Sequence, residues 1–342
     1  MEKSIFIHET SDVYSNATEL NGKIIISQNC TITCYGLLKM GKTSFISKNV
    51  TIDCFDFICG NNFCCLENTK IGGAGIYSKK AGIQIGNRTF IGQSCFLDVS
   101  EGIIIGDEVA VSNEACIYTH NSYLNVLDGF PCKNAPVEIG SNVHIGARAI
   151  ILPGVKIGDN CVIGAGTIVA KDIPSNSLYI GRNGTEILKR DYYPKPVDKD
   201  NIKKILEQIV LEYKERLELV GYNDLILMET NQAIVLTVSQ NNVIKIFTEG
   251  IISEPPPKDH MYIGVVDDKV LKSWTDTPNF EGYVFDIKNR RIYSDSGFSD
   301  LLEDFRNFLR RRGLRFDTDD FYKSISLRDK ISLKKIVGNT EG

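Results

Sequence analysis

A six-residue period constrains the fold of this chain more than any other feature of its sequence. Residues 139–174 divide into consecutive blocks, IGSNVH, IGARAI, ILPGVK, IGDNCV, IGAGTI and VAKDIP, each opened by Ile or Val. A small or β-branched residue usually holds the fifth place of a block, and Gly often holds the second. The same spacing joins earlier aliphatic residues: Ile26, Ile32 and Leu38; Ile46, Ile52 and Ile58; Ile85, Ile91 and Leu97; and Ile105, Val111 and Ile117.

This period predicts a coil of short strands joined by glycine-containing corners. A strand of two or three residues followed by a turn directs every sixth aliphatic side chain toward one axis. A single turn of chain cannot bury that side chain, so successive turns must stack and share a continuous core. Three blocks complete one triangular coil, and the repeat organises residues 24–181. Cys30, Cys95 and Cys161 occupy the small fifth place, which indicates a packing role.

Residues 36–43, GLLKMGKT, match the phosphate-loop pattern G-x-x-x-x-G-K-[ST]. That pattern binds nucleotide phosphates only where a helix follows, because the N–H groups at the start of the helix hold them. The residues that follow here are rich in β-branched and aromatic types and lack a helical apolar stripe. The six-residue period also slips at this point, so we interpret the match as a corner between short strands.

Composition excludes several classes of protein. The 342 residues suffice for two domains, and a net charge of −4 gives no reason to expect nucleic acid as a partner. No signal peptide is recognisable, and no apolar run approaches the ~20 residues of a membrane span. Ten cysteines without a C-x-x-C pair suit reduced, buried thiols better than a metal site. We therefore expect a cytoplasmic protein without a bound metal.

Two segments carry a resemblance to a known family. EACIYTHNS, followed by PVEIGSNVHIGARAIILPGVKIGDNCVIGAGTIVAKDIPSNSLYIG, resembles the hexapeptide-repeat acyltransferases, most of all the galactoside, maltose and polysaccharide O-acetyltransferases. The resemblance implies a left-handed parallel β-helix for residues 1–195 and a homotrimer with active sites between subunits. It also implies transfer of acetyl from acetyl-CoA to a sugar hydroxyl, in a bacterial surface polysaccharide or its precursor, sialic acid-containing chains included.

Acetyl transfer to a sugar hydroxyl needs a base, because the hydroxyl does not ionise at neutral pH. A histidine with an ordinary pKa near 6.5 is about three-quarters neutral at pH 7 and can accept the proton. Of the four histidines, His120 ends a run of coils at IYTHNS, where the loop NSYLNVLDGFPCKNAP begins. In the family this place holds the catalytic histidine and the loop shapes the acceptor pocket. Without the family, a histidine beside a loop is more often structural.

The family also implies cofactor contacts, mostly from backbone N–H groups at glycine-rich corners. Carried over by position, the cofactor-binding residues are His144, Gly146, Ala147, Ala165, Ala170 and Lys171. His144 departs from the family, which usually has Trp there to line the channel for the thiol arm. The usual ending G-N-P-A-K reads GRNGTE here, although Arg182, Lys189 and Arg190 keep positive charge nearby.

The period ends before residue 196, and residues 196–342 predict an α+β accessory domain of unknown role. Apolar residues at helical spacing predict a helix over residues 201–219. The segments DLILME, AIVLTVS, NVIKIFT, MYIGVV, YVFDI and RIYS read as strands, and a second helix is predicted from Asp300 to a stop at Gly313. The arginines at 310–312 fall at its C-terminal end, where the helix dipole favours cations.

Other functions remain open at this stage. The same fold and base could N-acetylate an amino sugar on a nucleotide carrier, and a coil can also serve as a non-catalytic scaffold. Serine acetylation is disfavoured, because residues 1–23 are too short for the helical domain that precedes the coils in that branch. A carbonic-anhydrase-like coil needs three zinc-binding histidines, and the coil region offers only His120 and His144.

Overall fold

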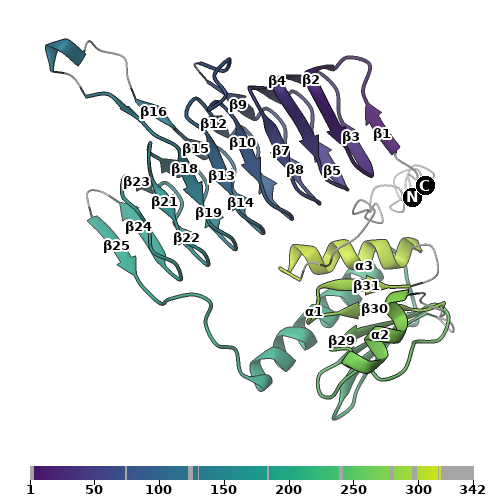
Figure 1. The fold of residues 1–342 in the computed structure, drawn as a ribbon. Helices are drawn as coiled ribbons and strands as arrows, with labels where there is room; N and C mark the ends of the chain where they lie inside the picture. Colours follow the sequence, from purple (N-terminus) through teal and green to yellow (C-terminus); the bar gives the residue numbers. More distant parts are fainter. Residues whose placement is uncertain are drawn as a thin grey trace, which may run out of the picture. The chain divides into compact units, whose positions relative to one another are not determined.

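The computed structural model describes residues 4–73, 75–121, 126–129, 131–182, 185–238, 242–276, 281–294, 299–314 and 316. Two compact units make up the chain, residues Met1–Lys195 and Pro196–Gly342. Figure 1 shows stacked short strands in the first unit and a sheet with helices in the second. The predicted fold class, a left-handed parallel β-helix with a C-terminal α+β domain, is confirmed.

The β-helix has three faces, which we number in chain order. The first face stacks β1 (Ser4–Ile7), β3 (Lys23–Ile26), β5 (Ser44–Ile46), β8 (Cys64–Cys65), β11 (Phe90–Ile91), β14 (Ala110–Val111), β19 (His144–Ile145), β22 (Val162–Ile163) and β24 (Leu178–Arg182). These strands pair in parallel, and β25 (Thr185–Lys189) adds an antiparallel edge.

The second and third faces share the long strand β4 (Thr31–Met40), which bends between them. The second face continues with β2 (Asp12–Leu20), β6 (Thr51–Cys54), β9 (Lys70–Gly72), β12 (Phe96–Asp98), β15 (Cys116–Ile117), β20 (Ile150–Ile151) and β23 (Ile168–Val169). The third face comprises β7 (Phe57–Cys59), β10 (Ile83–Ile85), β13 (Ile103–Ile105), β18 (Val137–Ile139) and β21 (Lys156–Ile157).

The repeated aliphatic residues form the core of the β-helix, as the period predicts. Ile91, Leu97 and Ile145 are fully buried, and they belong to one continuous apolar cluster that runs along the coil. The prediction for Ile58 was wrong, because its neighbours Phe57 and Cys59 point inward and Ile58 points outward. The register moves by one residue here, and a shift of one residue reverses the face of a strand.

The fifth-place cysteines pack as predicted and also make hydrogen bonds between coils. Cys30, Cys95 and Cys161 are buried. Their thiols donate to backbone carbonyl oxygens of the next coil, at 3.0 Å to Ser47, 3.2 Å to Ser112 and 3.2 Å to Pro174 respectively. Burial raises the pKa of the Cys95 and Cys161 thiols, which keeps them protonated.

The phosphate-loop pattern lies within the coil. Gly36 to Met40 belong to β4, Gly41 to Thr43 form a corner, and β5 follows where a phosphate-binding loop would need a helix. Residues 64–82, which lie between well-phased runs of the repeat, are only partly regular. Cys64–Cys65 and Lys70–Gly72 form the strands β8 and β9, and residues 75–82 form turns that lead out from the corner before β10.

The second unit contains a six-stranded sheet in the order β26 (Ile226–Glu229), β27 (Ala233–Thr237), β28 (Val243–Phe247), β29 (His260–Gly264), β30 (Tyr283–Asp286) and β31 (Arg291–Tyr293). Strands β28, β29 and β30 are parallel neighbours, and the outer pairs are antiparallel. The three helices are α1 (Lys199–Leu219), α2 (Asp268–Asp276) and α3 (Asp300–Arg311). The sequence analysis did not predict α2.

Helices α1 and α3 pack against each other within this unit. The rings of Tyr213 and Phe305 lie 4.6 Å apart, and Arg216 forms an ion pair of 2.5 Å with the buried Asp304. Ser299 caps the N-terminus of α3 by accepting a hydrogen bond from the N–H of Leu302, and Gly313 follows the helix with a positive φ of 83°. Arg312 pairs with Glu212 of α1, which supports a structural role for it.

Candidate active site

The β-helix departs from its regular stacking at His120. After β15 the chain leaves the corner between the second and third faces and returns only at β18. The excursion begins and ends as a short antiparallel pair, β16 (His120–Asn121) with β17 (Lys133–Asn134), and contains the short helix η1 (Val126–Asp128). Figure 1 shows it projecting from the coil. Residues 122–125 and 130 of the predicted acceptor loop lie outside the described residues.

His120 is held by a carboxylate that the sequence analysis did not select. Its Nδ1 lies 2.6 Å from Oδ2 of Asp98, and the His120 side chain is 32% exposed whereas that of Asp98 is fully buried. An ionised carboxylate only accepts hydrogen bonds, so Nδ1 carries the proton in this contact. The other ring nitrogen, Nε2, is then the one that can accept a proton from a substrate.

Hydrogen bonds surround Asp98 and keep it ionised. Oδ2 also accepts from the backbone N–H groups of Thr119, at 3.0 Å, and His120, at 3.1 Å. Oδ1 accepts from the Ser100 hydroxyl at 2.5 Å and from its N–H at 3.2 Å. Burial alone would raise the pKa of Asp98, but these donors together outweigh burial and lower the pKa below its ordinary value.

Two glycines make room for the buried carboxylate. A Cβ atom built on Gly73 would lie 2.1 Å from Oδ1 of Asp98 and 2.7 Å from Oγ of Ser100. Gly72 pairs directly with Asp98 across the β9–β12 register and places no side chain beside it. Strand alternation puts Asp98 on the outward side of β12, which in the sequence suggests a solvated carboxylate. Only the glycines of the preceding coil and the excursion at His120 make it a buried partner.

The corner between the third and first faces carries a ladder of side-chain caps. At each level the N–H that follows the corner glycine donates to a side-chain oxygen of the next coil. The donor and acceptor pairs are Lys42 and Asn61 (2.9 Å), Asn61 and Asn87 (2.9 Å), Asn87 and Asp107 (2.7 Å), Asp107 and Ser141 (3.1 Å), Ser141 and Asp159 (2.7 Å), and Asp159 and Ser175 (3.0 Å).

On the corner between the first and second faces, the side-chain caps are missing at the predicted cofactor residues. Gln93 N–H still donates to Asn113 Oδ1 at 3.0 Å. The next two coils place Ala147 and Ala165 at the equivalent position, and alanine has no oxygen to accept. Within the described part of the chain, the N–H groups of Asn113, Ala147 and Ala165 therefore have no hydrogen-bond partner. A row of free donors lies along this corner.

Gly146 brings the two alanine corners into close contact. Its ideal Cβ position lies 2.5 Å from the N atom of Ala165, so only glycine fits there. Gly166 N–H donates to the carbonyl of Ala147 at 2.8 Å. Ala147 is half-buried and Ala165 is exposed. Gly146, Ala147 and Ala165 thus lie together at the corner that leads into the second face.

Ala170 and Lys171 lie at the other end of β23, on the same corner of the coil as His120. Two coils separate them from β15, a distance of ~10 Å at the usual strand spacing. Ala170 and Lys171 are both exposed, and the Lys171 ammonium lies 5.6 Å from the ring centroid of Tyr179. The predicted cofactor residues therefore lie at both ends of the last strands of the second face, with Ala147 and Ala165 before them and Ala170 and Lys171 after them.

His144 lies on the outward side of β19, between Ala110 and Val162 in the register of the first face. Its Nε2 lies 3.0 Å from the hydroxyl oxygen of Ser112. Neighbouring atoms remove part of the water from the ring, which lowers the pKa of His144 below its ordinary value and favours the neutral form. Among the described residues, no hydrogen bond or ring contact joins His144 to His120.

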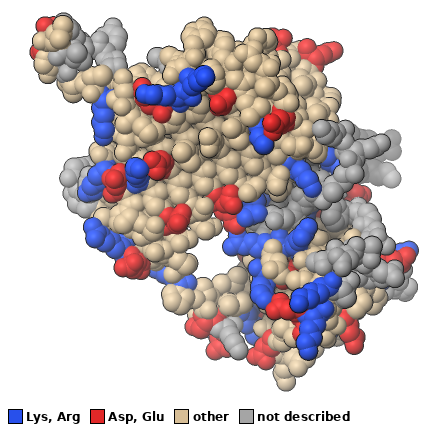
Figure 2. Space-filling model, in the orientation of Figure 1, with Lys and Arg blue, Asp and Glu red and all other residues tan. Residues whose placement is uncertain are grey.

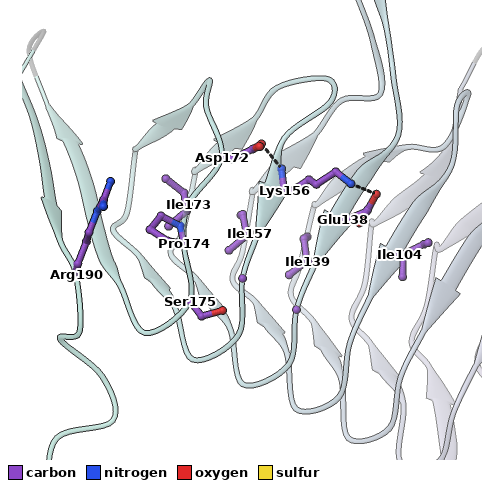
Figure 3. Close-up of a pocket in the computed structure, with 12 residues that line it drawn as sticks. Ile104, Glu138, Ile139, Lys156, Ile157, Asp172, Ile173, Pro174, Ser175 and Arg190 are labelled. Atoms are coloured by element: carbon purple, nitrogen blue, oxygen red, sulfur yellow. Dashed lines mark hydrogen bonds and ion pairs between the residues drawn. The ribbon is translucent and has the colours of Figure 1, made fainter.

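A separate pocket of about 570 Å³ opens on the third face, and none of the predicted site residues lines it. Figure 3 shows Lys156 bound to Glu138 and Asp172, with Arg190 apart from them. Lys156 forms an ion pair of 2.8 Å with Glu138, and its backbone N–H donates to Asp172 at 2.8 Å. Because Lys156 engages both carboxylates and no histidine lines the pocket, we assign this pocket no chemistry.

Charged side chains elsewhere on the β-helix are of mixed sign. Figure 2 shows basic and acidic residues interspersed on its visible face, with wide uncharged areas between them. The described residues contain no group of three or more His, Cys, Asp or Glu side chains placed to hold a metal ion. Of the helices within the described ranges, none combines the length and apolar character that a membrane crossing requires.

Comparison with known proteins agrees with the repeat. The family profile "Bacterial transferase hexapeptide (six repeats)" matches residues 136–171, and "Hexapeptide repeat of succinyl-transferase" matches residues 82–118. Residues 82–118 and 136–171 of this chain therefore carry the repeat of the hexapeptide-repeat transferases. Both matches lie in the β-helix of residues 1–195, which we call the hexapeptide-repeat unit, and the excursion after His120 lies between them.

Curated relatives match part of the hexapeptide-repeat unit. The galactoside O-acetyltransferase of Escherichia coli is 35% identical over 117 residues, which cover 34% of this chain and 58% of the relative. A serine acetyltransferase of Synechococcus elongatus is 28% identical over 137 residues, or 40% of this chain and 55% of the relative. This chain spans little more than half the length of these relatives.

Solved structures of this fold resemble the hexapeptide-repeat unit more distantly. A polySia-specific acetyltransferase, NeuO, matches with 22% identity and a TM-score of 0.39, over 56% of this chain and 85% of that chain. At this level the similarity concerns the coil and does not extend to the substrate.

Proposed function

We propose that this protein is an O-acetyltransferase that moves acetyl from acetyl-CoA to a hydroxyl of a sugar, with His120 as the general base. The observation that carries the proposal is the contact between His120 and the buried Asp98, at the corner where the coil opens. A carboxylate that fixes the tautomer and orientation of an imidazole is the usual arrangement for activating a hydroxyl.

In this reaction Nε2 of His120 takes the proton of the acceptor hydroxyl while its oxygen attacks the thioester carbonyl carbon. The carbon–sulfur bond then breaks, and the imidazolium returns the proton to the departing thiolate of coenzyme A. Asp98 stabilises the imidazolium that forms between these steps, because its charge lies 2.6 Å from Nδ1. Such general-base catalysis typically contributes about 10²–10⁴ in rate.

The uncapped corner supports a place for acetyl-CoA. The free N–H groups of Ala147 and Ala165 can donate to the amide oxygens of its pantetheine arm, or to the oxyanion that develops on the thioester. His144 and Gly146 lie on the first-face side of these alanines. Ala170 and Lys171 lie at the far end of β23, where Lys171 can meet a phosphate.

We propose a homotrimer with sites between subunits, as the resemblance to the family implies, and the surface of the second face supports this proposal. Its outward side chains near the site are apolar, whereas a sheet face turned to water usually carries polar ones. Ile168 is 54% exposed, and Phe96, Cys116 and Ile150 precede it in the same outward row. A groove between two such faces would place the base of one subunit beside the donors of another.

The acceptor class is inferred from relatives, and those relatives differ. Similar proteins include both a galactoside O-acetyltransferase and a serine acetyltransferase. A sugar of a bacterial surface polysaccharide or its precursor, sialic acid-containing chains included, is our proposed acceptor. N-acetylation of a nucleotide-linked amino sugar is the alternative, and the same base could perform it.

The decisive experiment pairs His120→Ala with a screen of acceptors. Purified protein is mixed with acetyl-CoA and a panel of sugars, amino sugars, oligosaccharides and serine, and released thiol is followed. We expect a sugar hydroxyl to be acetylated and His120→Ala to fold normally while losing nearly all transfer. Variant activity within about threefold of the parent would remove His120 as the base, since such a base contributes far more.

A further inference from the structure

Exposed tyrosines gather along the corner of the coil that carries His120. Tyr77 is 73% exposed and Tyr14 is 58% exposed, and Tyr35 is half-buried. The rings of Tyr35 and Tyr77 lie 4.6 Å apart and are tilted by 55°. Together with Asp53, which faces outward from β6, we call these residues the tyrosine edge. Single exposed apolar side chains are ordinary, but a row of aromatic rings on the same corner as the proposed base needs an explanation.

The strand register places this edge in line with the candidate active site. Tyr14 of β2 pairs with Thr33 of β4, which pairs with Asp53 of β6. The next residues in this outward row are Gly72 of β9 and then Asp98 of β12. At the usual spacing of strands, Asp53 lies ~10 Å and Tyr14 ~19 Å from Asp98 along the coil. The row thus ends at the carboxylate that holds His120.

The excursions from the coil follow the same line. Tyr77 belongs to the turns at residues 75–82, which leave the corner between the second and third faces. His120 leaves the same corner further along the chain, and Figure 1 shows both excursions projecting from one edge of the β-helix. Gly72 lies between Asp53 and Asp98 in this row and has no side chain. The surface between the two carboxylates therefore forms a shallow depression.

The edge offers the two kinds of contact that sugar rings make. Tyrosine rings present flat apolar faces. The Tyr14 hydroxyl donates to Oδ1 of Asn16 at 3.1 Å, and its oxygen can still accept a hydrogen bond at the rim. Oδ1 of Asp53 is shielded from solvent and receives no hydrogen bond from any of the described residues. A carboxylate oxygen without a partner is costly, and a sugar hydroxyl could supply one after a small rotation of the side chain.

We propose that the tyrosine edge binds successive rings of an extended, uncharged oligosaccharide, whose terminal part reaches His120. This inference rests on the proposed function, because it takes the acceptor to be a sugar. The rings of Tyr14, Tyr35 and Tyr77 stack on the apolar faces of the sugar units, and Asp53 accepts from a hydroxyl. The negative charge of Asp53 opposes a polyanionic chain, so the edge favours neutral sugars over sialic acid polymers.

Binding can be measured without acetyl transfer. His120→Ala retains the whole tyrosine edge, and calorimetry follows its binding of linear glucose and N-acetylglucosamine oligomers, from the monosaccharide to longer chains. We expect affinity to rise with chain length by about tenfold, which corresponds to roughly 1.4 kcal/mol. We expect that gain to vanish when Tyr35→Ala and Tyr77→Ala are added, or when Tyr14→Ala is added alone. Linear sialic acid oligomers should bind less tightly than neutral ones.

The matched control is Tyr192→Ala, which removes a partly exposed tyrosine from a different corner of the coil, where its N–H donates to Asn176. It should leave the dependence on chain length unchanged. Equal affinity for a monosaccharide and its oligomers, or oligomer binding that survives loss of the tyrosines, would overturn the inference. Oligomers that bind at the edge while the parent protein acetylates no sugar would instead overturn the proposed function.

Discussion

Replacing Asp98 with asparagine tests whether this carboxylate sets up His120 for catalysis. In the structure Oδ2 of Asp98 accepts from Nδ1 of His120 and from the N–H groups of Thr119 and His120, while Oδ1 accepts from Ser100. Asparagine keeps the size of the side chain but turns one acceptor into a donor. An amide NH₂ at the Oδ2 position would face these three donors and the Thr119 hydroxyl, and would favour the wrong tautomer of His120.

The contacts set the size of the effect. A hydrogen bond to a charged partner contributes roughly 1.5–3 kcal/mol, so loss of the carboxylate charge beside the imidazolium slows the reaction by about 10–100-fold. Inversion of the tautomer adds to this and can bring the loss to ~10⁴-fold, as in serine proteases that lose the charge of their aspartate. We therefore expect kcat to fall by about 10²–10⁴ while KM for acetyl-CoA changes little.

The assay follows thiol release from acetyl-CoA across pH, with unfolding measured in parallel. Because the pKa of Asp98 is lowered by folding, its ionised form stabilises the protein above its ordinary pKa of 3.8, and that stability is lost as pH falls through the lowered value. The variant should therefore be less stable at neutral pH. Ser100→Ala is the control, since it removes a donor to Oδ1 without touching His120. A folded Asp98→Asn protein with nearly full kcat and an unchanged pH profile would refute the reasoning.

Two further predictions concern the cofactor side of the site. Ala165→Asn should place an acceptor opposite the Ala147 N–H and so occupy that donor. KM for acetyl-CoA should rise by about tenfold if one hydrogen bond of roughly 1.4 kcal/mol is lost. Ser141→Ala, on the other corner, should leave KM unchanged, and equal KM values for the parent and both variants would contradict this role. His144 has a lowered pKa, so the unfolded chain binds its proton more readily and the folded state loses stability as pH falls below 6.5. Denaturant titrations at several pH values should show that the free energy of unfolding of His144→Gln falls less than that of the parent below pH 6.5. An equal fall in both proteins would argue against a lowered pKa for His144.

The repeat could be predicted from the sequence because it depends on local spacing. Aliphatic residues six apart define one inward direction, whichever coil they belong to, and the break at His120 appears as the end of that spacing. The predicted α1 and α3 and the strands of the second unit were recognised in the same way. The short helix α2, DKVLKSWTD, carries too few apolar residues to reveal its period.

The tertiary structure decided which side chains meet across coils. Alternation along β12 indicates that Asp98 faces outward, but not that Gly72 and Gly73 of the preceding coil leave space for it or that the chain returns with His120 beside it. The same holds for the free N–H groups at Ala147 and Ala165, whose missing caps become visible only when neighbouring coils are aligned. These contacts join residues about twenty apart, and the register between coils, which no local pattern encodes, determines them.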